Sequence, residues 1–211
     1  MSTSHQIRRN PIFNNNKFKL GTFATNTIGS VQSNAPDAYS PSWENSLRLA
    51  KIVDRAGFEA ILGLARWKTP AKTPLTHRGN FVLDSFTWAA ALAMATEHVA
   101  VFSTSHAPTV HPLVIAKQCA TIDHVSGGRF GLNVVGGWNR PEFDMFGIKL
   151  LEHDARYDYL TEWMNVIRKL WGDTEEFDFE GSFLKLKGAL DRKSTRLNSS
   201  HRIASRMPSS A

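Results

Sequence analysis

Short apolar runs alternate with segments of helical periodicity along most of this chain, between residues 17 and 172. The pattern predicts strands at residues 18–25, 58–64, 99–104 and 129–135. It predicts helices at residues 43–56, 84–97, 112–126 and 154–171. The last helix is the clearest, because its apolar residues recur at intervals of three and four. Strand–helix repetition of this kind indicates an α/β fold with a parallel sheet covered by helices.

Two architectures fit this repetition, an open doubly wound sheet and a (β/α)₈ barrel. Four strand–helix pairs occupy about 155 residues here, so eight pairs need roughly the 250 or more residues typical of barrels. A chain of 211 residues has room for only the first half of a barrel. After the last helix, residues 177–187 alternate around Gly181 in a way that predicts a short hairpin.

The two ends of the chain differ in character from its middle. Residues 1–16 are polar and rich in Asn, without the apolar region of a signal peptide, which indicates a flexible N-terminal arm. Residues 191–211 contain six Ser and no aromatic residue. This segment is either a disordered tail or a non-native one resembling translated cloning sequence, and we favour the second interpretation. The predicted barrel segment is therefore residues 17–190.

Charge and cysteine content narrow the function classes. The formal net charge is +6, but the tail contains five basic residues and one acidic residue, so residues 1–190 are only mildly basic. No basic stripe or nucleic-acid motif is present, so we expect no nucleic-acid partner. No run reaches the ~18 apolar residues of a membrane span. The single cysteine, Cys119, excludes an intrachain disulfide and predicts a cytoplasmic protein.

Standard catalytic motifs are mostly missing from the sequence. There is no P-loop, no nucleophile elbow and no H-E-x-x-H motif. The glycines at Gly127 and Gly128 precede a predicted strand, so they indicate a helix-to-strand turn and not a dinucleotide loop. His106 and His111 are a weak metal pair without a carboxylate partner, and we expect no metal site.

Polar and aromatic residues gather where the predicted strands end. In parallel α/β folds ligands bind at the carboxyl ends of the strands. The residues at or shortly after these ends are Ala65, Arg66, Trp67, His106, Asn133, Trp138, Glu142, Arg156 and Tyr157. A polar Asn133 inside a buried strand needs a partner, either a neighbouring backbone group or a ligand. Arg156 near a helix N-terminus is unfavourable for the helix dipole, which suggests an anion or a pairing with Asp154 or Glu152.

Three segments, in order, resemble one enzyme family. They are Ala-Thr-Ile-Asp-His-Val-Ser-Gly-Gly-Arg-Phe-Gly-Leu-Asn at residues 120–133, Gly-Trp-Asn-Arg-Pro-Glu-Phe at 137–143, and Glu-His-Asp-Ala-Arg-Tyr-Asp-Tyr-Leu at 152–160. This set is similar to the bacterial-luciferase-like flavin-dependent monooxygenases, in the branch of alkanesulfonate, dimethylsulfone and pyrimidine monooxygenases. The resemblance covers about residues 17 to 190.

The resemblance implies a fold, a cofactor and partners. The fold is a (β/α)₈ barrel, truncated here to its N-terminal half. Reduced FMN reacts with O₂ to give a peroxyflavin, which oxygenates a small organosulfur or heterocyclic substrate. A separate NAD(P)H-dependent flavin reductase supplies the reduced FMN, and the full-length protein is expected to form a homo-oligomer. Two alternatives remain, a deazaflavin-dependent hydride-transfer oxidoreductase of the same superfamily and an inactive truncated fragment.

The resemblance also assigns roles to residues of this sequence. The residues implied to bind the cofactor are Ala65, Arg66, Asn133, Glu142, Arg156 and Tyr157. The chemistry of the side chains, and not the resemblance, makes His106 and Trp138 the candidates for catalytic residues. His106 either hydrogen-bonds the substrate or peroxide or is a satisfied loop histidine. Trp138 either forms a wall that excludes water or is an ordinary packing residue. Reduced flavin and its phosphate are anionic, so Arg66 and Arg156 are suitable neighbours.

Overall fold

The computed structural model describes residues 10–28, 35–70 and 77–191. Its main sheet has four parallel strands in the order β1-β2-β3-β4. The strands are β1 (Gly21–Phe23), β2 (Ala60–Leu62), β3 (Ala100–His106) and β4 (Phe130–Val135). Each strand lies beside the one before it, whereas a doubly wound sheet reverses its strand order. The prediction of a partial (β/α)₈ barrel is therefore confirmed and the doubly wound alternative is excluded.

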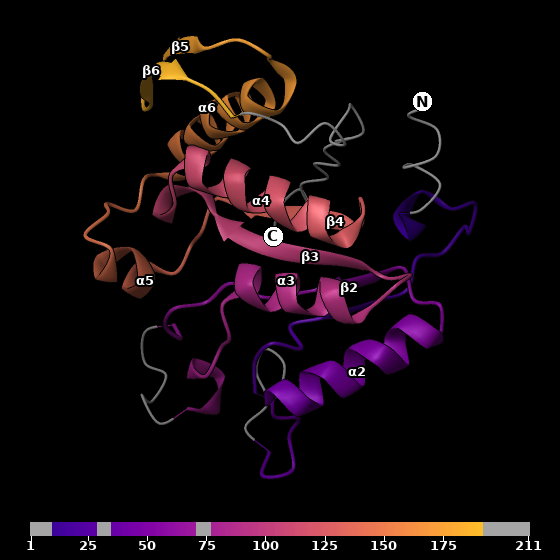
Figure 1. Cartoon of the computed structure of the whole chain (residues 1–211). Coiled ribbons are helices and arrows are strands. Elements are labelled where there is room, and N and C mark those ends of the chain that lie inside the picture. Colours follow the sequence, from indigo (N-terminus) through magenta and orange to yellow (C-terminus); the bar gives the residue numbers. More distant parts are fainter. Residues whose placement is uncertain (1–9, 29–34, 71–76, 192–211) are drawn as a thin grey trace.

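The helices form a continuous layer over one face of this sheet. They are α2 (Trp43–Arg55), α3 (Ser85–Ala95), α4 (Pro112–Ser126) and α6 (His153–Gly172). Contacts run from α2 to α3, from α3 to α4 and from α4 to α6, and Figure 1 shows the helices following one another around the strands. None of the helices in the described residues is long and apolar enough to cross a bilayer.

The strand register separates two faces of the sheet. Ile61 and Val101 are paired and lie in the apolar core against the helices. Because side chains alternate along a strand, the paired Leu62 and Phe102 lie on the opposite face, which in a closed barrel is the inner one. Gly131 pairs with Phe102 on that face, and a Cβ at Gly131 would lie 2.2 Å from Phe102 Cε1.

Local signals explain where the helices begin and end. Asp84 accepts a hydrogen bond from Thr87 N at 2.8 Å and caps α3, as predicted. Pro112 is the first residue of α4, and the helix ends at Gly127, whose φ of 68° suits glycine. The turn predicted at Gly127 and Gly128 is confirmed. Cys119 is buried within α4.

The structure differs from the sequence prediction at several boundaries. The strands β1 and β2 are shorter than predicted, and Phe18 lies outside the sheet and is 85% exposed. The strand β3 continues two residues beyond the predicted end, to His106. In the described residues, a short helix, α5 (Arg140–Met145), and three 3₁₀ turns were not predicted; the turns are η1 (Pro11–Phe13), η2 (Arg78–Asn80) and η3 (Ala107–Thr109). The predicted hairpin is present as β5 (Phe177–Glu180) and β6 (Lys185–Ala189).

A buried arginine joins the elements at the end of the sheet where β3 and β4 begin. Arg129 Nη2 donates to Ala93 O at 3.0 Å and to Thr96 O at 2.7 Å, and its Nη1 donates to Val99 O at 2.7 Å. The Nε atom donates to Ser126 O at 2.9 Å. The guanidinium therefore satisfies carbonyl groups left unpaired where α3 and α4 end.

Residues just outside both ends of the predicted barrel segment make contacts with it. Asn14 and Asn16, within the segment predicted as a flexible arm, donate to Glu59 Oε1 at 3.1 and 2.7 Å. These bonds and one from Leu20 N lower the pKa of Glu59 to about 2. Asp191 is buried and forms an ion pair with Lys117. Residues 1–9 and 192–211 lie outside the described residues, so the domain boundaries stay a prediction.

Candidate functional site

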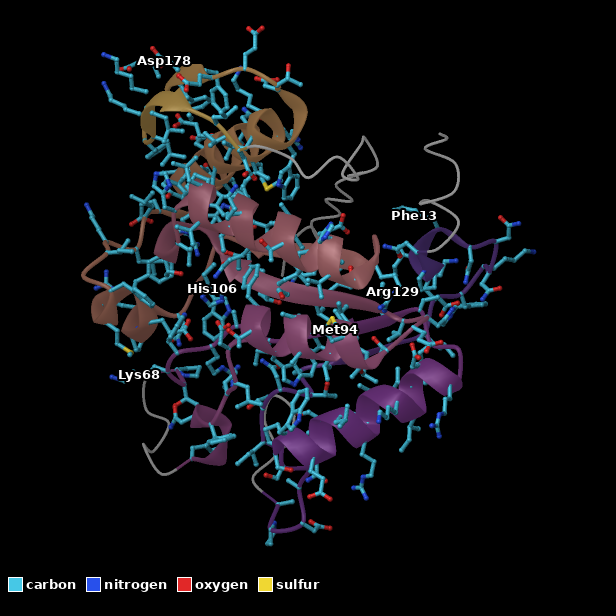
Figure 2. All side chains as sticks on the ribbon, in the orientation of Figure 1. Phe13, Lys68, Met94, His106, Arg129 and Asp178 are labelled. Carbon is cyan, nitrogen blue, oxygen red and sulfur yellow. The ribbon has the colours of Figure 1, made fainter. Side chains whose placement is uncertain are left out.

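Most of the predicted site residues lie at the carboxyl ends of β2, β3 and β4. Figure 2 shows His106 and Lys68 at one end of the sheet and Arg129 at the other. Three connections meet at the first end: the loop after β2, the turn η3 after β3 and the helix α5 after β4. This is the edge where ligands bind in parallel α/β folds.

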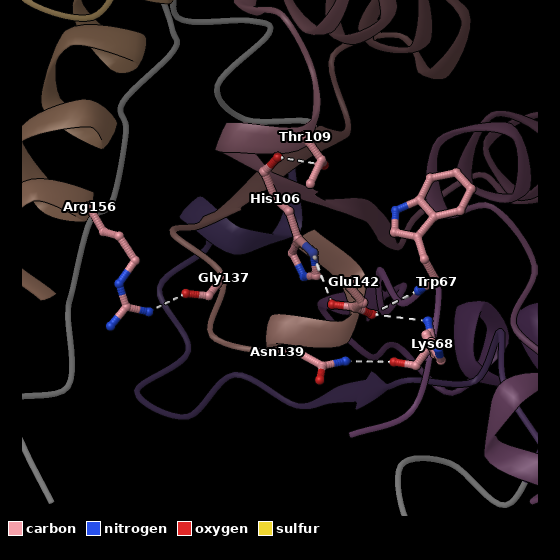
Figure 3. A network of polar contacts seen from close by, with 8 residues as sticks. All are labelled: Trp67, Lys68, His106, Thr109, Gly137, Asn139, Glu142 and Arg156. Atoms are coloured by element: carbon pink, nitrogen blue, oxygen red, sulfur yellow. Dashed lines mark hydrogen bonds and ion pairs between the residues drawn. The ribbon is translucent and has the colours of Figure 1, made fainter. Parts of the chain in front are cut away.

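Glu142 connects two of these segments. It lies on α5 and is 2% exposed. Its Oε1 accepts hydrogen bonds from Trp67 N at 2.8 Å and from Lys68 N at 3.3 Å (Figure 3). Asn139, which precedes α5, donates from Nδ2 to Lys68 O at 2.7 Å. The loop after β2 is thus attached to α5 through both its amide and carbonyl groups.

His106 faces the second oxygen of the same carboxylate. Its Nδ1 lies 3.6 Å from Glu142 Oε2, too far for a hydrogen bond, and has no hydrogen-bond partner although it is buried. The backbone O of His106 accepts from Thr109 Oγ1 at 3.0 Å, which fixes the start of η3. Burial lowers the pKa of His106, Glu142 raises it, and Arg66 lowers it. The net effect is downward, so the imidazole is neutral at neutral pH.

Arg66 belongs to the same electrostatic cluster. Burial lowers the pKa of its guanidinium, and the charge of Glu142 raises it. A guanidinium remains charged in proteins despite such a shift. The cluster therefore combines one cation, one carboxylate and one neutral imidazole in a partly desolvated region.

A cavity of about 400 Å³ adjoins this cluster. Ala65, Arg66 and Trp67 line it from the loop after β2, and His106 lines it from β3. Apolar side chains of α3, α4 and the neighbouring loops complete much of the wall. Its volume and its combination of an apolar wall with polar side chains are typical of small-molecule sites.

The side chain of Asn133 is hydrogen-bonded to another residue of the protein. Its Nδ2 donates to Thr104 Oγ1 at 3.0 Å, and Thr104 Oγ1 donates to Gly63 O at 2.6 Å. A hydrogen-bonded row thus crosses β4, β3 and the end of β2. Of the two possibilities left open by the sequence, a neighbouring protein group accounts for one amide hydrogen, although the partner is a side chain and not the backbone.

The predicted residues of α6 lie apart from the Glu142 cluster. Arg156 Nη1 donates to Gly137 O at 2.5 Å, and its Nε is buried without a partner. Neither pairing suggested for the Arg156 side chain, with Asp154 or with Glu152, is formed among the described residues, and the Asp154 carboxylate lies 2.9 Å from His153 Nδ1 instead. Figure 3 shows Arg156 reaching the loop after β4 from the side opposite Trp67.

Two aromatic candidates are at the surface of the described residues. Trp138 is 68% exposed and Tyr157 is 38% exposed. The Tyr157 ring packs against His153, with 4.8 Å between the ring centroids. The role of Trp138 as a wall that excludes water stays a prediction.

The structure brings together Ala65, Arg66, His106 and Glu142, and it places Asn133 one strand from His106. Sequence reasoning missed Asn139 and Thr104. Asn139 precedes Arg140 and Pro141, and a proline near the first turn is a helix-start signal that could have identified α5. Thr104 lies at the predicted end of its strand, but the sequence could not show its hydrogen bonds to Gly63 and Asn133, because these partners are far away in the sequence. No cluster of three potential metal ligands occurs in the part of the chain that the structure describes.

Comparison with known proteins identifies one family. Residues 18–199 match the model of the luciferase-like monooxygenases. A pyrimidine monooxygenase of Serratia proteamaculans (strain 568) is 35% identical over 173 residues, which cover 80% of this chain and 46% of the relative. The chain spans about half the length of the curated relatives it matches.

Solved structures agree on the fold. A riboflavin lyase with a modified FMN superimposes with a TM-score of 0.71 at 23% identity, covering 84% of this chain and 47% of the other. An EDTA monooxygenase from Chelativorans sp. BNC1 gives a TM-score of 0.70 at 24% identity, covering 83% and 48%. At these identities the likeness shows the fold alone.

Proposed function

The chain belongs to the luciferase-like monooxygenase family, and from this premise we propose that it forms the flavin-binding half of an FMN-dependent monooxygenase. The observation that supports this best is the cluster of Arg66, His106 and Glu142 beside a cavity of about 400 Å³ at the carboxyl end of the sheet. Enzymes with this barrel architecture place their active sites at that end. The match of 80% of the chain to a pyrimidine monooxygenase supports the reaction class, and the modified FMN in a riboflavin lyase of similar fold supports the choice of cofactor.

The residues present fit an anionic, planar cofactor. Arg156 Nε is a buried polar atom without a partner, and such an atom is costly unless a ligand or water binds it. Arg66 and Arg156 would hold the anionic groups of FMN by charge-assisted hydrogen bonds. We assign Ala65, Asn133 and Tyr157 to the same cofactor site, with Glu142 acting through the loop that it holds.

When bound, reduced FMN supplies the two electrons that allow one oxygen atom of O₂ to enter the substrate while the other becomes water. The residues of the chain bind and orient the cofactor and the substrate, and they exclude water from the site. Glu142 and Asn139 fix the loop that contains Arg66 and Trp67. The apolar cavity wall limits the access of water to the reacting atoms. The neutral imidazole of His106 can form a hydrogen bond with the substrate without placing a charge in the site.

We propose a small heterocycle of the pyrimidine class as the substrate, with organosulfur compounds as the second class, and a separate NAD(P)H-dependent reductase as the source of reduced FMN. The substrate class follows the name of the pyrimidine monooxygenases that are 35% identical to this chain. A homo-oligomer of the full-length protein is part of the same proposal. Oxygen consumption by the full-length protein, supplied with a reductase and NADH, should rise on addition of uracil. A broad panel of heterocycles and sulfonates without any oxygenated product would refute the proposal.

Cofactor binding can be tested on the chain itself. We expect Arg66→Gln to weaken the binding of reduced FMN about tenfold, because a charge-assisted hydrogen bond contributes about 1.5–3 kcal/mol. Anaerobic fluorescence titration measures the dissociation constant. Arg48→Gln, at an exposed position of α2, is the matched control and should leave it unchanged. A reduced deazaflavin that binds more tightly than FMN would favour hydride transfer instead.

A further inference from the structure

The two oxygens of Glu142 face different partners. Oε1 accepts from the consecutive amides of Trp67 and Lys68, at 2.8 and 3.3 Å. Oε2 is directed toward His106 Nδ1 at 3.6 Å (Figure 3). The carboxylate is buried, and the protein groups around both oxygens leave it little freedom to turn toward a ligand.

The chemistry of this pair determines which nitrogen of His106 bears the proton. A carboxylate accepts hydrogen bonds and donates none. A neutral imidazole has one N–H and one acceptor nitrogen. The nitrogen that faces Glu142 is therefore the N–H, and a closure of less than about 1 Å makes it a hydrogen bond. Active-site hydrogen bonds are often long before the ligand binds and shorten in the complex.

We propose that Glu142 is a positioning residue for His106: with one oxygen it holds the loop after β2, and with the other it keeps the proton of His106 on Nδ1. Nε2 of His106 is then the acceptor that this edge of the cavity offers to a substrate N–H or O–H group. The loop and the tautomer are properties of the chain alone. Only the identity of the donor, which we take to be a ring N–H of a cyclic amide, rests on the proposed function.

The other charged groups near His106 are consistent with a neutral ring. Arg66 lines the same cavity and opposes a second positive charge. Asp84 also lines it, but its Oδ1 is occupied in capping α3. Glu142 is thus the carboxylate placed to choose the tautomer of His106.

Two substitutions separate the two tasks of Glu142. Glu142→Gln keeps an oxygen that can accept from Trp67 N and Lys68 N, but places an amide donor toward His106. Glu142→Ala removes both interactions. Asp144→Asn, at an exposed carboxylate of the same helix, is the matched control.

The tautomer is measured by ¹⁵N NMR of the His106 ring in the 211-residue chain. We expect Nδ1 to bear the proton in the wild type and in Asp144→Asn. In Glu142→Gln the proton should move to Nε2, and the pKa of His106 should fall further because the charge that raises it is gone. A wild-type ring protonated on Nε2, or one tautomer in all variants, overturns the proposal.

The loop is measured by amide hydrogen exchange at Trp67 and Lys68. Glu142→Ala should speed exchange at both amides about tenfold or more, since each loses an accepting carboxylate. Glu142→Gln should restore protection to within about threefold of the wild type. If Glu142→Ala leaves both amides protected, or if Glu142→Gln exposes them as strongly as Glu142→Ala, the proposed role in the loop is wrong.

Reaction kinetics of the full-length protein distinguish this proposal from the proposed function. Glu142→Gln should raise the KM for uracil about tenfold while the dissociation constant of FMN stays within about threefold. A rise in both constants would make Glu142 a cofactor contact and contradict the positioning role. Absence of FMN binding in the wild type, with the NMR and exchange results as expected, would refute the proposed function and leave the assignment of Glu142 standing.

Discussion

At the scale of single residues, the glycine at position 131 allows β3 and β4 to pack together, because it has no side chain. The Phe102 ring lies over Gly131, where a Cβ would approach to within 2.2 Å of Cε1. Real Cβ atoms do not tolerate such a distance, so the ring or the strand would have to move. The glycine is thus a requirement of packing on the inner face.

Gly131→Ala is therefore expected to lower the free energy of unfolding by about 1–3 kcal/mol, the usual cost of overpacking. Urea denaturation of the chain measures it. The control is Gly172→Ala at the end of α6, where nothing lies within 4 Å of an added Cβ. That change should be neutral or slightly stabilising, because alanine favours the helix. Equal losses in both variants would show that the contact with Phe102 is not the cause.

Asp123 is a second residue that affects stability, because its carboxyl group is unfavourable in the folded protein when it is ionised. Burial raises its pKa to about 6, against a lowering hydrogen bond from Phe130 N. The folded state then holds the proton more tightly than the unfolded state, so this group's contribution is most favourable below about pH 4 and is lost as the pH rises through about 6. Asp123→Asn should raise the free energy of unfolding by about 1–2 kcal/mol at about pH 8. The gain should vanish near pH 4; a gain independent of pH would contradict this account.

At the scale of elements, Arg129 joins the helices to the strands at the end of the sheet where β3 and β4 begin. Its guanidinium donates hydrogen bonds to the backbone carbonyl oxygens of Ala93, Thr96, Val99 and Ser126. The pKa of its guanidinium is lowered by burial and raised by Asp54, which itself accepts from the amides of residues 97–99. The ends of α2, α3 and α4 are thereby fixed against the starts of β3 and β4.

Arg129→Ala should reduce the free energy of unfolding by about 3 kcal/mol or more, because it leaves several buried carbonyls unpaired. Thermal or urea unfolding measures the loss. Arg55→Ala removes an arginine at an exposed position of α2 and should change stability by less than about 0.5 kcal/mol. Arg129 would not be a junction if the two variants were equally stable.

At the scale of the whole molecule, the described sheet is open on its inner face. Phe23 is paired with Leu62 on that face and is 48% exposed. In a closed barrel such side chains fill the interior. The four described strands provide one side of that interior, with β1 and β4 at the edges of the sheet.

The 211-residue chain expressed by itself is therefore expected to self-associate through this face. Phe23→Ser should weaken the association about tenfold, since burial of a phenylalanine contributes about 1.5–3 kcal/mol. Light scattering over a concentration series measures it. Val114→Ser changes a similarly exposed residue on the helical side, on α4, and should have little effect. If the chain is monomeric at all concentrations, the inner face of the sheet does not cause self-association.

The sequence by itself determined the alternation of strands and helices, most helix boundaries and the end of the sheet where the candidate site lies. These features depend on local signals: apolar periodicity, Asp84 as a cap, Pro112 at a helix start and Gly127 at a helix end. Because parallel strands end at one edge, residues that follow the strands gather there whatever their sequence separation. Arg66, His106 and Glu142 could be predicted as neighbours for that reason.

Only the tertiary structure decided which polar groups meet. Glu142 accepts from Trp67 N across 75 residues of sequence, Asn133 donates to Thr104 on the next strand, and Arg156 donates to Gly137 O in place of an acidic neighbour. A side chain's hydrogen-bond partner depends on distances of a few tenths of an ångström, which packing sets and periodicity does not. The sequence therefore placed the residues at one edge, and the packing of α5 and α6 against the strand ends chose their partners.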